Sequence, residues 1–329
     1  MLANLPTPLE RADRLGRALG LDAGRLWVKR DDCTGLATGG NKVRKLELLV
    51  ADALATGCDV LVTAGGPQSN HARTTAAAAA RAGLGCVLAF NADPPERTEG
   101  NQILDVILGA ERRFVGQIAM DDLNHVVNEI ADELREAGRK PYVIPIGGSS
   151  PLGASAYVAA ADEIVADLGH DDVLVVTATG SGGTHAGLAA RLGHSRVIGV
   201  DVGAVADALS TVRRLTGEVA TLVGRPLPTD EPRLVRDQIG TGYGAPTDAC
   251  REAIRITARS EGLLLDPVYS GKAMAGLMNM NPAALSQKAI VFLATGGTPG
   301  RLDPGRHDAA TTRVPSMLAR CPGMEHQYA

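Results

Sequence analysis

Short, continuous apolar runs alternate along this chain with longer stretches that carry leucine and alanine at helical spacing. Such runs are typical of strands buried on both faces, which occur in parallel sheets connected by crossover helices. The expected strands cover 26–29, 60–63, 86–90, 142–145, 173–177, 196–200 and 289–293, and the expected helices include 45–56, 71–83, 124–137, 153–167 and 186–191. The pattern therefore predicts an α/β protein with mostly parallel sheets and helices on both faces.

The length of the chain allows two lobes. At 329 residues there is ample material for two hydrophobic cores, and a Gly-Gly-Ser-Ser-Pro turn at 147–151 separates two strand-and-helix blocks. We therefore expect a boundary near residue 150. The tail from Asp303 onward is polar and lacks periodicity, so no structure is predicted for it.

Charge and composition favour a small-molecule ligand. The formal net charge is −4 and no long basic block occurs, which argues against a nucleic acid or an anionic membrane as partner. No apolar stretch reaches the roughly 18 residues of a membrane helix, and the first residues do not resemble a secretory signal, so we expect a cytoplasmic protein. The five cysteines lack metal-type spacing, and no metal site is expected.

A lysine preceded by glycines marks the first candidate site. Gly39, Gly40 and Asn41 come directly before Lys42, after the expected strand 26–29. Glycines let the backbone approach a bulky group, and a lysine held in such a place can form a Schiff base with a carbonyl. A tight turn followed by the basic start of a surface helix explains the same residues. Both interpretations stay open on this segment alone.

A glycine-rich turn follows the expected strand 173–177. Residues Thr179 to His185 read Thr-Gly-Ser-Gly-Gly-Thr-His and precede a helical run, so several backbone amides and the positive end of a helix dipole would meet there. This arrangement predicts a cradle for a monophosphate. The motif lacks both the Gly-Lys-Ser/Thr ending of a nucleotide P-loop and the Gly-x-Gly-x-x-Gly spacing of a dinucleotide site. A purely structural turn remains the alternative.

Three further turns carry groups capable of chemistry. Ser69, Asn70 and His71 follow an expected strand, but the nucleophile pattern Gly-x-Ser-x-Gly is absent and helix capping explains Ser69 or Asn70 equally well. Tyr243 and Tyr269 lie in turns, where either could act as an acid, a base or a stacking wall. Because open α/β sheets bind ligands at the carboxyl ends of their strands, all these loops could line one crevice.

Together these segments resemble the pyridoxal-phosphate (PLP) enzymes of fold type II, the tryptophan synthase β-like group, in the branch that contains ACC deaminase and D-cysteine desulfhydrase. The resemblance runs in order from Leu5 to about Gly300. The segments that carry it are 5–9, 29–32, 39–47, 68–71, 182–188, 266–272 and 295–297. It implies two open, twisted, mostly parallel sheets. A larger PLP-binding domain would comprise 1–44 plus 151–329, a smaller one 45–150, with the active site in the crevice between them.

The resemblance also implies roles for particular residues. Lys42 would bind the cofactor covalently, Lys45 and the cradle would hold its phosphate, and Asn70 would bond its phenolic oxygen. Ser69, Asn70, His71, Tyr243 and Tyr269 would contact the substrate, with Ser69 and both tyrosines counted as catalytic beside Lys42. Ser270 and Thr295 would lie near the ring nitrogen. The cradle residues are Gly180, Ser181, Gly182, Gly183 and Thr184. A homodimer is also implied.

Two positions separate activities within that branch. ACC deaminases resemble each other in carrying Glu and Leu where this chain has Ser270 and Thr295. A hydroxyl near the ring nitrogen holds a proton less well than a carboxylate, so the ring is a weaker electron sink and β-elimination is favoured over ring opening. The preferred substrate is a small amino acid, D-cysteine, which would yield pyruvate, ammonia and hydrogen sulfide.

Three alternatives stay open. The segment from Asp32 to Lys42 also resembles L-cysteate sulfo-lyases, which release sulfite. A sulfonate requires additional cationic groups, for which His71 and Arg73 are candidates. ACC deamination comes next, followed by a binding protein that keeps the fold without turnover.

Overall fold

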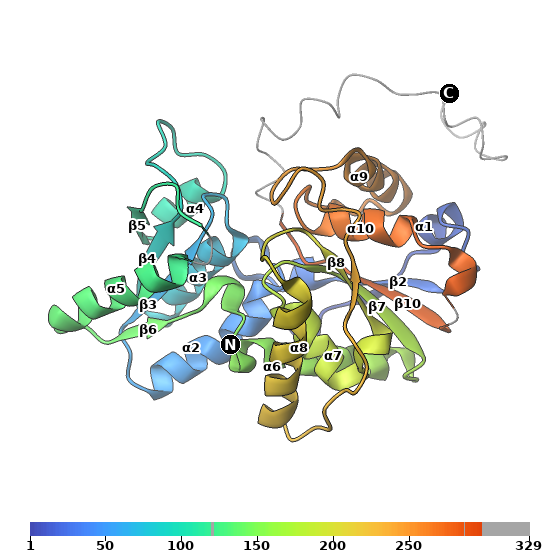
Figure 1. Cartoon of the computed structure of the whole chain (residues 1–329), viewed down its shortest axis with the longest axis horizontal. Coiled ribbons are helices and arrows are strands. Elements are labelled where there is room, and N and C mark those ends of the chain that lie inside the picture. The colour runs from blue at the N-terminus through green and yellow to red at the C-terminus, as the bar shows by residue number, and fades with distance from the viewer. Residues whose placement is uncertain (120–121, 286, 298–329) are drawn as a thin grey trace.

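The computed structural model describes residues 1–119, 122–285 and 287–297, and contains two separate sheets (Figure 1). The six-stranded sheet has the order β1 (Leu9–Arg11), β2 (Leu26–Lys29), β10 (Ala289–Leu293), β7 (Val173–Thr179), β8 (Val197–Asp201) and β9 (Arg233–Val235). The four-stranded sheet has the order β5 (Glu111–Phe114), β4 (Gly85–Phe90), β3 (Val60–Gly65) and β6 (Pro141–Val143). All neighbouring pairs are parallel except β1 with β2.

Ten α-helices occur within the described residues, and they cover both faces of each sheet (Figure 1). On the six-stranded sheet, α1 (Asp13–Ala18), α9 (Asp248–Glu261) and α10 (Ser270–Met278) cover one face, while α6 (Pro151–Leu168) and α7 (Gly183–Leu192) cover the other. On the four-stranded sheet, α2 (Lys42–Ala55) and α3 (Asn70–Ala82) lie opposite α5 (Leu123–Glu136). The remaining helices are α4 (Asn101–Ile107) and α8 (Ala208–Leu222).

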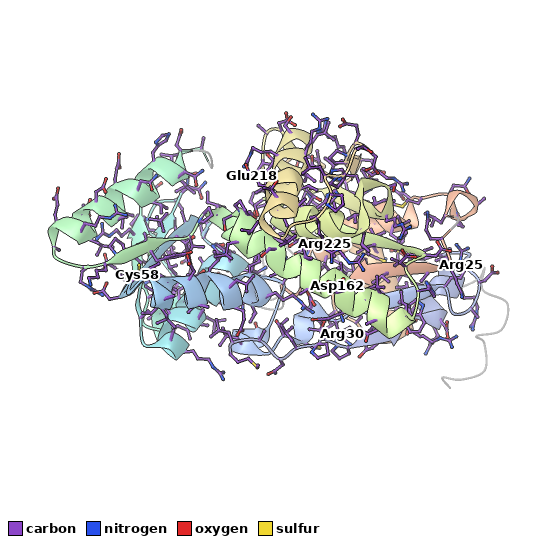
Figure 2. All side chains as sticks on the ribbon, turned by 90° about the horizontal axis from the view of Figure 1, so that it is seen from below. Arg25, Arg30, Cys58, Asp162, Glu218 and Arg225 are labelled. Carbon is purple, nitrogen blue, oxygen red and sulfur yellow. The ribbon has the colours of Figure 1, made fainter. Side chains whose placement is uncertain are left out.

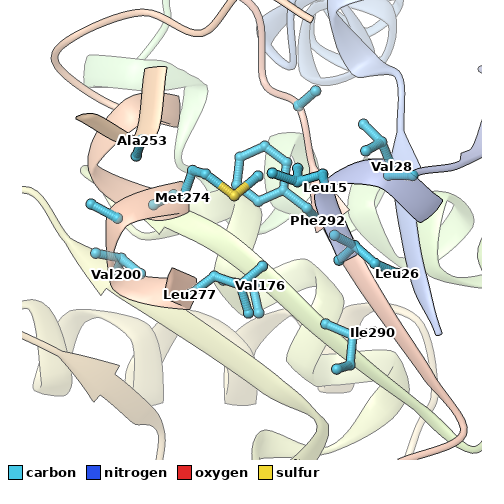
Figure 3. Close-up of a cluster of buried hydrophobic side chains, with 14 of the residues drawn as sticks. Leu15, Leu26, Val28, Val176, Val200, Ala253, Met274, Leu277, Ile290 and Phe292 are labelled. Carbon is cyan, nitrogen blue, oxygen red and sulfur yellow. The ribbon is translucent and has the colours of Figure 1, made fainter. Parts of the chain in front are cut away.

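Successive residues of the central strands pack into different cores. In β7, Leu174 and Val176 face a cluster that contains Met274 of α10 (Figure 3), whereas Val173 and Val175 face α6 and α7. Side chains alternate between the faces of a strand, so a strand covered on both faces must be apolar at every position. This explains why the apolar runs are continuous rather than alternating.

The predicted fold class is confirmed, and so are the strands and helices that the apolar runs indicated, with shifts of a few residues at their ends. Helix α2 begins at Lys42, three residues before the expected start, so the lysine occupies the first turn. Strands β1, β5 and β9 and helices α1, α8, α9 and α10 were not predicted. The tail from Asp303 lies outside the described residues.

Ion pairs on the surface join some of the helices without fixing the fold. Asp162 on α6 lies 3.5 Å from Arg225, which follows α8 (Figure 2). An exposed pair of this kind contributes about 0–1 kcal/mol to the free energy of unfolding. Among the described residues, no helix has the length and hydrophobicity needed to cross a membrane.

Candidate active site

A cavity of about 320 Å³ lies where the carboxyl ends of β3 and β7 meet the first turns of α2, α3 and α7. Its walls therefore come from both sheets. The predicted site residues that line it are Lys42, Lys45, Ser69, Asn70, His71, Gly180, Ser181, Gly182, Gly183, Thr184, Tyr243, Tyr269 and Thr295. A second cavity of about 300 Å³ adjoins it and shares Ser69, Asn70, Tyr243 and Tyr269 with it.

Lys42 places its amine in the wall of this cavity. Its Nζ donates to the carbonyl of Gly147 at 3.3 Å, and the residue is half-buried. Burial lowers the pKa of Lys42 to about 8, because an ammonium loses hydration there. A useful fraction of this amine is thus neutral, and therefore nucleophilic, near neutral pH.

Lys45 lies one turn further along α2 and reaches the same carbonyl. Its Nζ donates to Gly147 at 3.1 Å and to Ser149 Oγ at 3.2 Å. Burial, and then the charge of Lys42, lower its pKa well below the ordinary value. No ion pair to a carboxylate is formed by either lysine among the described residues. Two buried amines that converge without an acidic partner form a site that an anion would stabilise.

The glycine-rich turn lies directly beside these lysines. Gly182 has φ +84°, a value that favours glycine, and α7 begins at Gly183. A Cβ atom at Gly183 would lie 2.6 Å from Ser149 Oγ and 2.7 Å from Lys45 Nζ, so only glycine fits without displacing them. The first backbone amides of a helix lack intrahelical acceptors and, with the helix dipole, favour phosphate. The cradle, its hydroxyls and Lys45 therefore suit a monophosphate.

Asn70 is oriented by a residue that the sequence did not reveal. Asn101, fully buried at the start of α4, donates from Nδ2 to Asn70 Oδ1 at 3.0 Å and to the Gln68 carbonyl at 2.9 Å. Because the oxygen of Asn70 is engaged in this way, its amide nitrogen is left as the donor for the cavity. Ser69 caps α3 by accepting from the Ala72 amide at 3.1 Å, as the capping interpretation predicted, and also lines the cavity.

His71 is a neutral group with a fixed tautomer. Burial, with smaller contributions from Lys42 and Lys45, lowers its pKa well below the ordinary value. Thr63 Oγ1 donates to the Ile144 carbonyl at 2.8 Å, so it must accept from His71 Nε2 at 2.9 Å. His71 therefore contributes no positive charge to the cavity.

The far wall combines two tyrosines with a buried carboxylate. The hydroxyls of Tyr243 and Tyr269 contact each other, and their rings meet edge to face with centroids 6.1 Å apart. Asp266 lines both cavities and accepts from the backbone amides of residues 268–270. Ser270 is 1% exposed and is not among the lining residues of either cavity; its Oγ donates to Asp266 Oδ2 at 2.5 Å. Of the bonded pair Asp266 and Ser270, the carboxylate therefore lines the cavity and the serine hydroxyl does not.

A buried network anchors the first turn of α2. Asp31 is fully buried and accepts from Arg44 Nε at 3.0 Å and from the Tyr157 hydroxyl at 2.6 Å. Arg44 also pairs with Glu163 of α6. Asn41 Nδ2 donates to Thr184 Oγ1 at 3.0 Å, which connects α2 to the cradle. The position of Lys42 is therefore determined by contacts with both α6 and α7.

Sequence reasoning missed several residues of this site. Ser149 and Gly147 lie in the turn that was interpreted as a boundary, although a glycine- and serine-rich turn after a strand is also typical of a binding loop. Asn101 carried no comparable local signal, and Asp266 opens one of the segments that carry the family resemblance but was assigned no role. Cys33 lies near the lysine motif in sequence but is exposed and is not among the residues that line the two cavities.

Comparison with known proteins identifies the class. The family model described as "Pyridoxal-phosphate dependent enzyme" matches residues 1–296. A protein of Pyrococcus abyssi, whose name provisionally assigns it as a 1-aminocyclopropane-1-carboxylate deaminase, is 41% identical over 304 residues, which are 89% of this chain and 90% of that protein. The crystal structure of an ACC deaminase homologue superposes with a TM-score of 0.84 at 39% identity, covering 91% of this chain and 92% of that one.

A more distant structure shares the fold alone. Threonine deaminase isoform 2 of Solanum lycopersicum matches with a TM-score of 0.63 at 18% identity, covering 90% of this chain and 80% of that chain. The fold and the cofactor-binding family together define a PLP-dependent enzyme of fold type II. Within this class, the chain belongs to the ACC deaminase family. The predicted cofactor is thereby confirmed.

Proposed function

We propose that the protein is a lyase that eliminates the β-substituent of a cysteine-like amino acid, with D-cysteine as the first candidate substrate. With one water, D-cysteine would give pyruvate, ammonia and hydrogen sulfide. The observation that carries the choice of a thiol is the charge of the cavity wall. The cationic side chains among its described lining residues are Lys42, Lys45 and Arg214.

Each of these three cations has a partner other than the substrate side chain. Lys42 is proposed to bind the cofactor aldehyde, and Lys45 its phosphate. Arg214 lies on α8, whose residues flank Gly182 of the cradle, and it pairs with Glu218. His71 is neutral, and Arg73 donates to the carbonyls of Ala37 and Gly39 rather than lining either cavity. The cations that sulfonate recognition would require are thus engaged elsewhere, which supports sulfide over sulfite as the leaving group.

We propose roles for the residues that line the cavity from their positions in it. Bound PLP supplies an electron sink for negative charge at the substrate Cα. The Lys42 amine would be the group that takes the proton from the substrate Cα. One hydroxyl of the touching pair Tyr243 and Tyr269 is proposed to donate to the departing sulfur, and the Ser69 hydroxyl is proposed to bind the substrate carboxylate. The Asn70 amide is proposed to donate to the cofactor's phenolic oxygen.

ACC deamination is the second candidate, and two observations favour it. The names of the relatives at 41% and 39% identity refer to ACC deaminase. In addition, the Ser270 hydroxyl donates to the carboxylate of Asp266, so this part of the wall contains an acidic group and not a hydroxyl alone. The inference of a weak electron sink from Ser270 therefore loses part of its force. Thr295, which lines the cavity where ACC deaminases carry Leu, still supports elimination.

A substrate panel separates these candidates. Purified enzyme is assayed with D-cysteine, L-cysteine, L-cysteate, β-chloro-D-alanine and ACC, with pyruvate, 2-oxobutyrate, sulfide and sulfite measured separately. We expect pyruvate and sulfide from D-cysteine, and none from Lys42→Ala, which should also lose the visible absorbance of bound PLP. Turnover of ACC alone would overturn the proposal, and sulfite from L-cysteate would show that the charge argument is wrong.

We further propose that the two sheets belong to separate domains, 1–44 plus 151–329 and 45–150, and that the enzyme is a homodimer. The cavity walls from both sheets support a site in the crevice between the domains. The family resemblance supports the dimer. A mass of 34.0 kDa per chain makes monomer and dimer easy to separate by light scattering of the purified enzyme.

A further inference from the structure

The backbone that leads into Lys42 adopts a conformation that side chains disfavour. Ala37 has φ +43° and Thr38 has φ +72°, followed by Gly39 at +72° and Gly40 at +119°. Gly39 is required, since a Cβ there would lie 2.2 Å from the Asp32 carbonyl oxygen. Ala37 and Thr38 are strained, because in the left-handed region a Cβ approaches the following carbonyl. The branched side chain of Thr38 tolerates this approach less well than the methyl group of Ala37. Such strain persists only where neighbouring groups hold the backbone in place.

Arg73 holds this loop from the side of the four-stranded sheet. It projects from α3, is 1% exposed, and its Nη1 donates to the carbonyl of Ala37 and, at 3.4 Å, to that of Gly39. Thr34, in the segment that follows β2, donates from Oγ1 to the Gly40 carbonyl at 2.9 Å. The Arg73 guanidinium thus binds the backbone carbonyls at both ends of the segment 37–39, which contains the two strained residues. Lys42 begins α2 three residues after Gly39.

The hydrogen bonds of Arg73 are directed at the loop rather than at a carboxylate. The pKa of Arg73 is lowered to about 10 because burial outweighs the opposing effect of Asp105, a fully buried residue of α4. Neither carboxylate oxygen of Asp105 has a hydrogen-bond partner among the described residues. A buried Arg that only balanced this charge would be expected to bond it directly. The carbonyls of the loop therefore explain the geometry of Arg73 better than charge balance does.

We propose that Arg73 is a positioning residue: it keeps residues 37–39 in the left-handed region and thereby sets where the Lys42 amine enters the cavity. The inference rests on the proposed role of Lys42 as the cofactor-binding amine. It predicts that Arg73 matters less when the loop is no longer strained. Glycine adopts the φ of Thr38 without steric cost, so Thr38→Gly relieves part of what Arg73 has to hold.

A double-mutant cycle tests this coupling. Wild type, Arg73→Met, Thr38→Gly and the double variant are compared by PLP affinity of the apoenzyme, the separate effects on kcat and KM, and hydrogen exchange of the amides at 36–41. Loss of the two bonds should weaken PLP binding about 10-fold or more and speed exchange in the loop. In the Thr38→Gly background the same substitution should cost less than a third of that factor. Asp105→Asn, the matched control, should leave PLP affinity within about threefold.

Three results would overturn the inference. One is equal loss of PLP affinity in both backgrounds, and another is an Asp105→Asn variant that reproduces Arg73→Met. The third is a lowered melting temperature with unchanged loop exchange, which would make Arg73 a residue of the core alone. Should Arg73→Met not fold, Arg73→Lys, which keeps the charge with one donor centre, enters the same cycle.

The outcome for Lys42 is read separately. Borohydride reduction and peptide mapping of the wild-type holoenzyme locate the lysine that binds PLP. A label on another lysine would contradict the proposed function, while loop exchange in the apoenzyme would still support or refute the role of Arg73.

Discussion

The amine of Lys42 should titrate far below an ordinary lysine. Its pKa falls from 10.5 to about 8 through burial. At pH 7 a group with this pKa is about 9% neutral, against about 0.03% for an ordinary lysine, a ratio of about 300. The same shift corresponds to about 3 kcal/mol of preference for the neutral form. Near neutral pH, nearly all of the greater reactivity of Lys42 towards an aldehyde, compared with an ordinary lysine, should come from its larger neutral fraction.

Pulse acetylation of the apoenzyme measures this titration. The protein, freed of PLP, is exposed briefly to an amine reagent between pH 6 and 11, and peptides that contain Lys42 are quantified by mass spectrometry. The exposed Lys140 in the same digest is the internal reference. Modification of Lys42 should rise with a midpoint near pH 8. A midpoint at pH 10 or above would refute the argument from burial.

The same shift has a consequence for stability. Between pH 8 and 10.5 the unfolded chain holds a proton on Lys42 that the folded apoenzyme does not, so the free energy of unfolding should increase with pH in this window. Urea unfolding at several pH values should show this increase, and a smaller one in Lys42→Met. Asn101→Ala should weaken PLP binding several-fold in a fluorescence titration without loss of secondary structure, because Asn70 loses the donor that orients its amide; unchanged affinity would exclude this role. Gly183→Ala should weaken PLP binding more severely, because its Cβ would lie 2.7 Å from Lys45 Nζ; wild-type affinity would argue against the cradle.

Much of the fold was predictable because its central strands are buried on both faces. Residues 173–177 and 289–293 carry no polar interruption of the apolar run except Thr177, and such runs are visible without any tertiary information. Helix α9 was not predicted because its buried residues are the small Cys250, Ala253 and Thr257, which recur at helical spacing but do not form a run of large apolar side chains. Strand β5 begins with the exposed Glu111 at the edge of its sheet and reads as a polar loop.

The candidate site was predictable where one local motif supplies several functional groups. The lysine motif and the glycine-rich turn each place their groups within a few residues, so local sequence singles both out as candidates, although a structural turn explains either one by itself. Asn101 contacts Asn70 across 31 residues, and Ser149 contacts Ser181 across 32. These contacts depend on how the sheets and loops come together, which no local pattern specifies. The Asp266–Ser270 bond is local, but the position of Asp266 in the cavity wall depends on the tertiary fold.

The strand order of the larger sheet bears on how the chain folds during synthesis. Strand β2, near the start of the chain, pairs with β10, made some 260 residues later, and β10 also separates β2 from β7. The four-stranded sheet uses only residues 60–143 and can therefore assemble while β2 still lacks its central neighbour. Contacts this distant in sequence slow folding and leave apolar strands exposed on the way. The segment that carries Lys42 is thus translated early, yet it can acquire its final surroundings only after nearly the whole chain has left the ribosome.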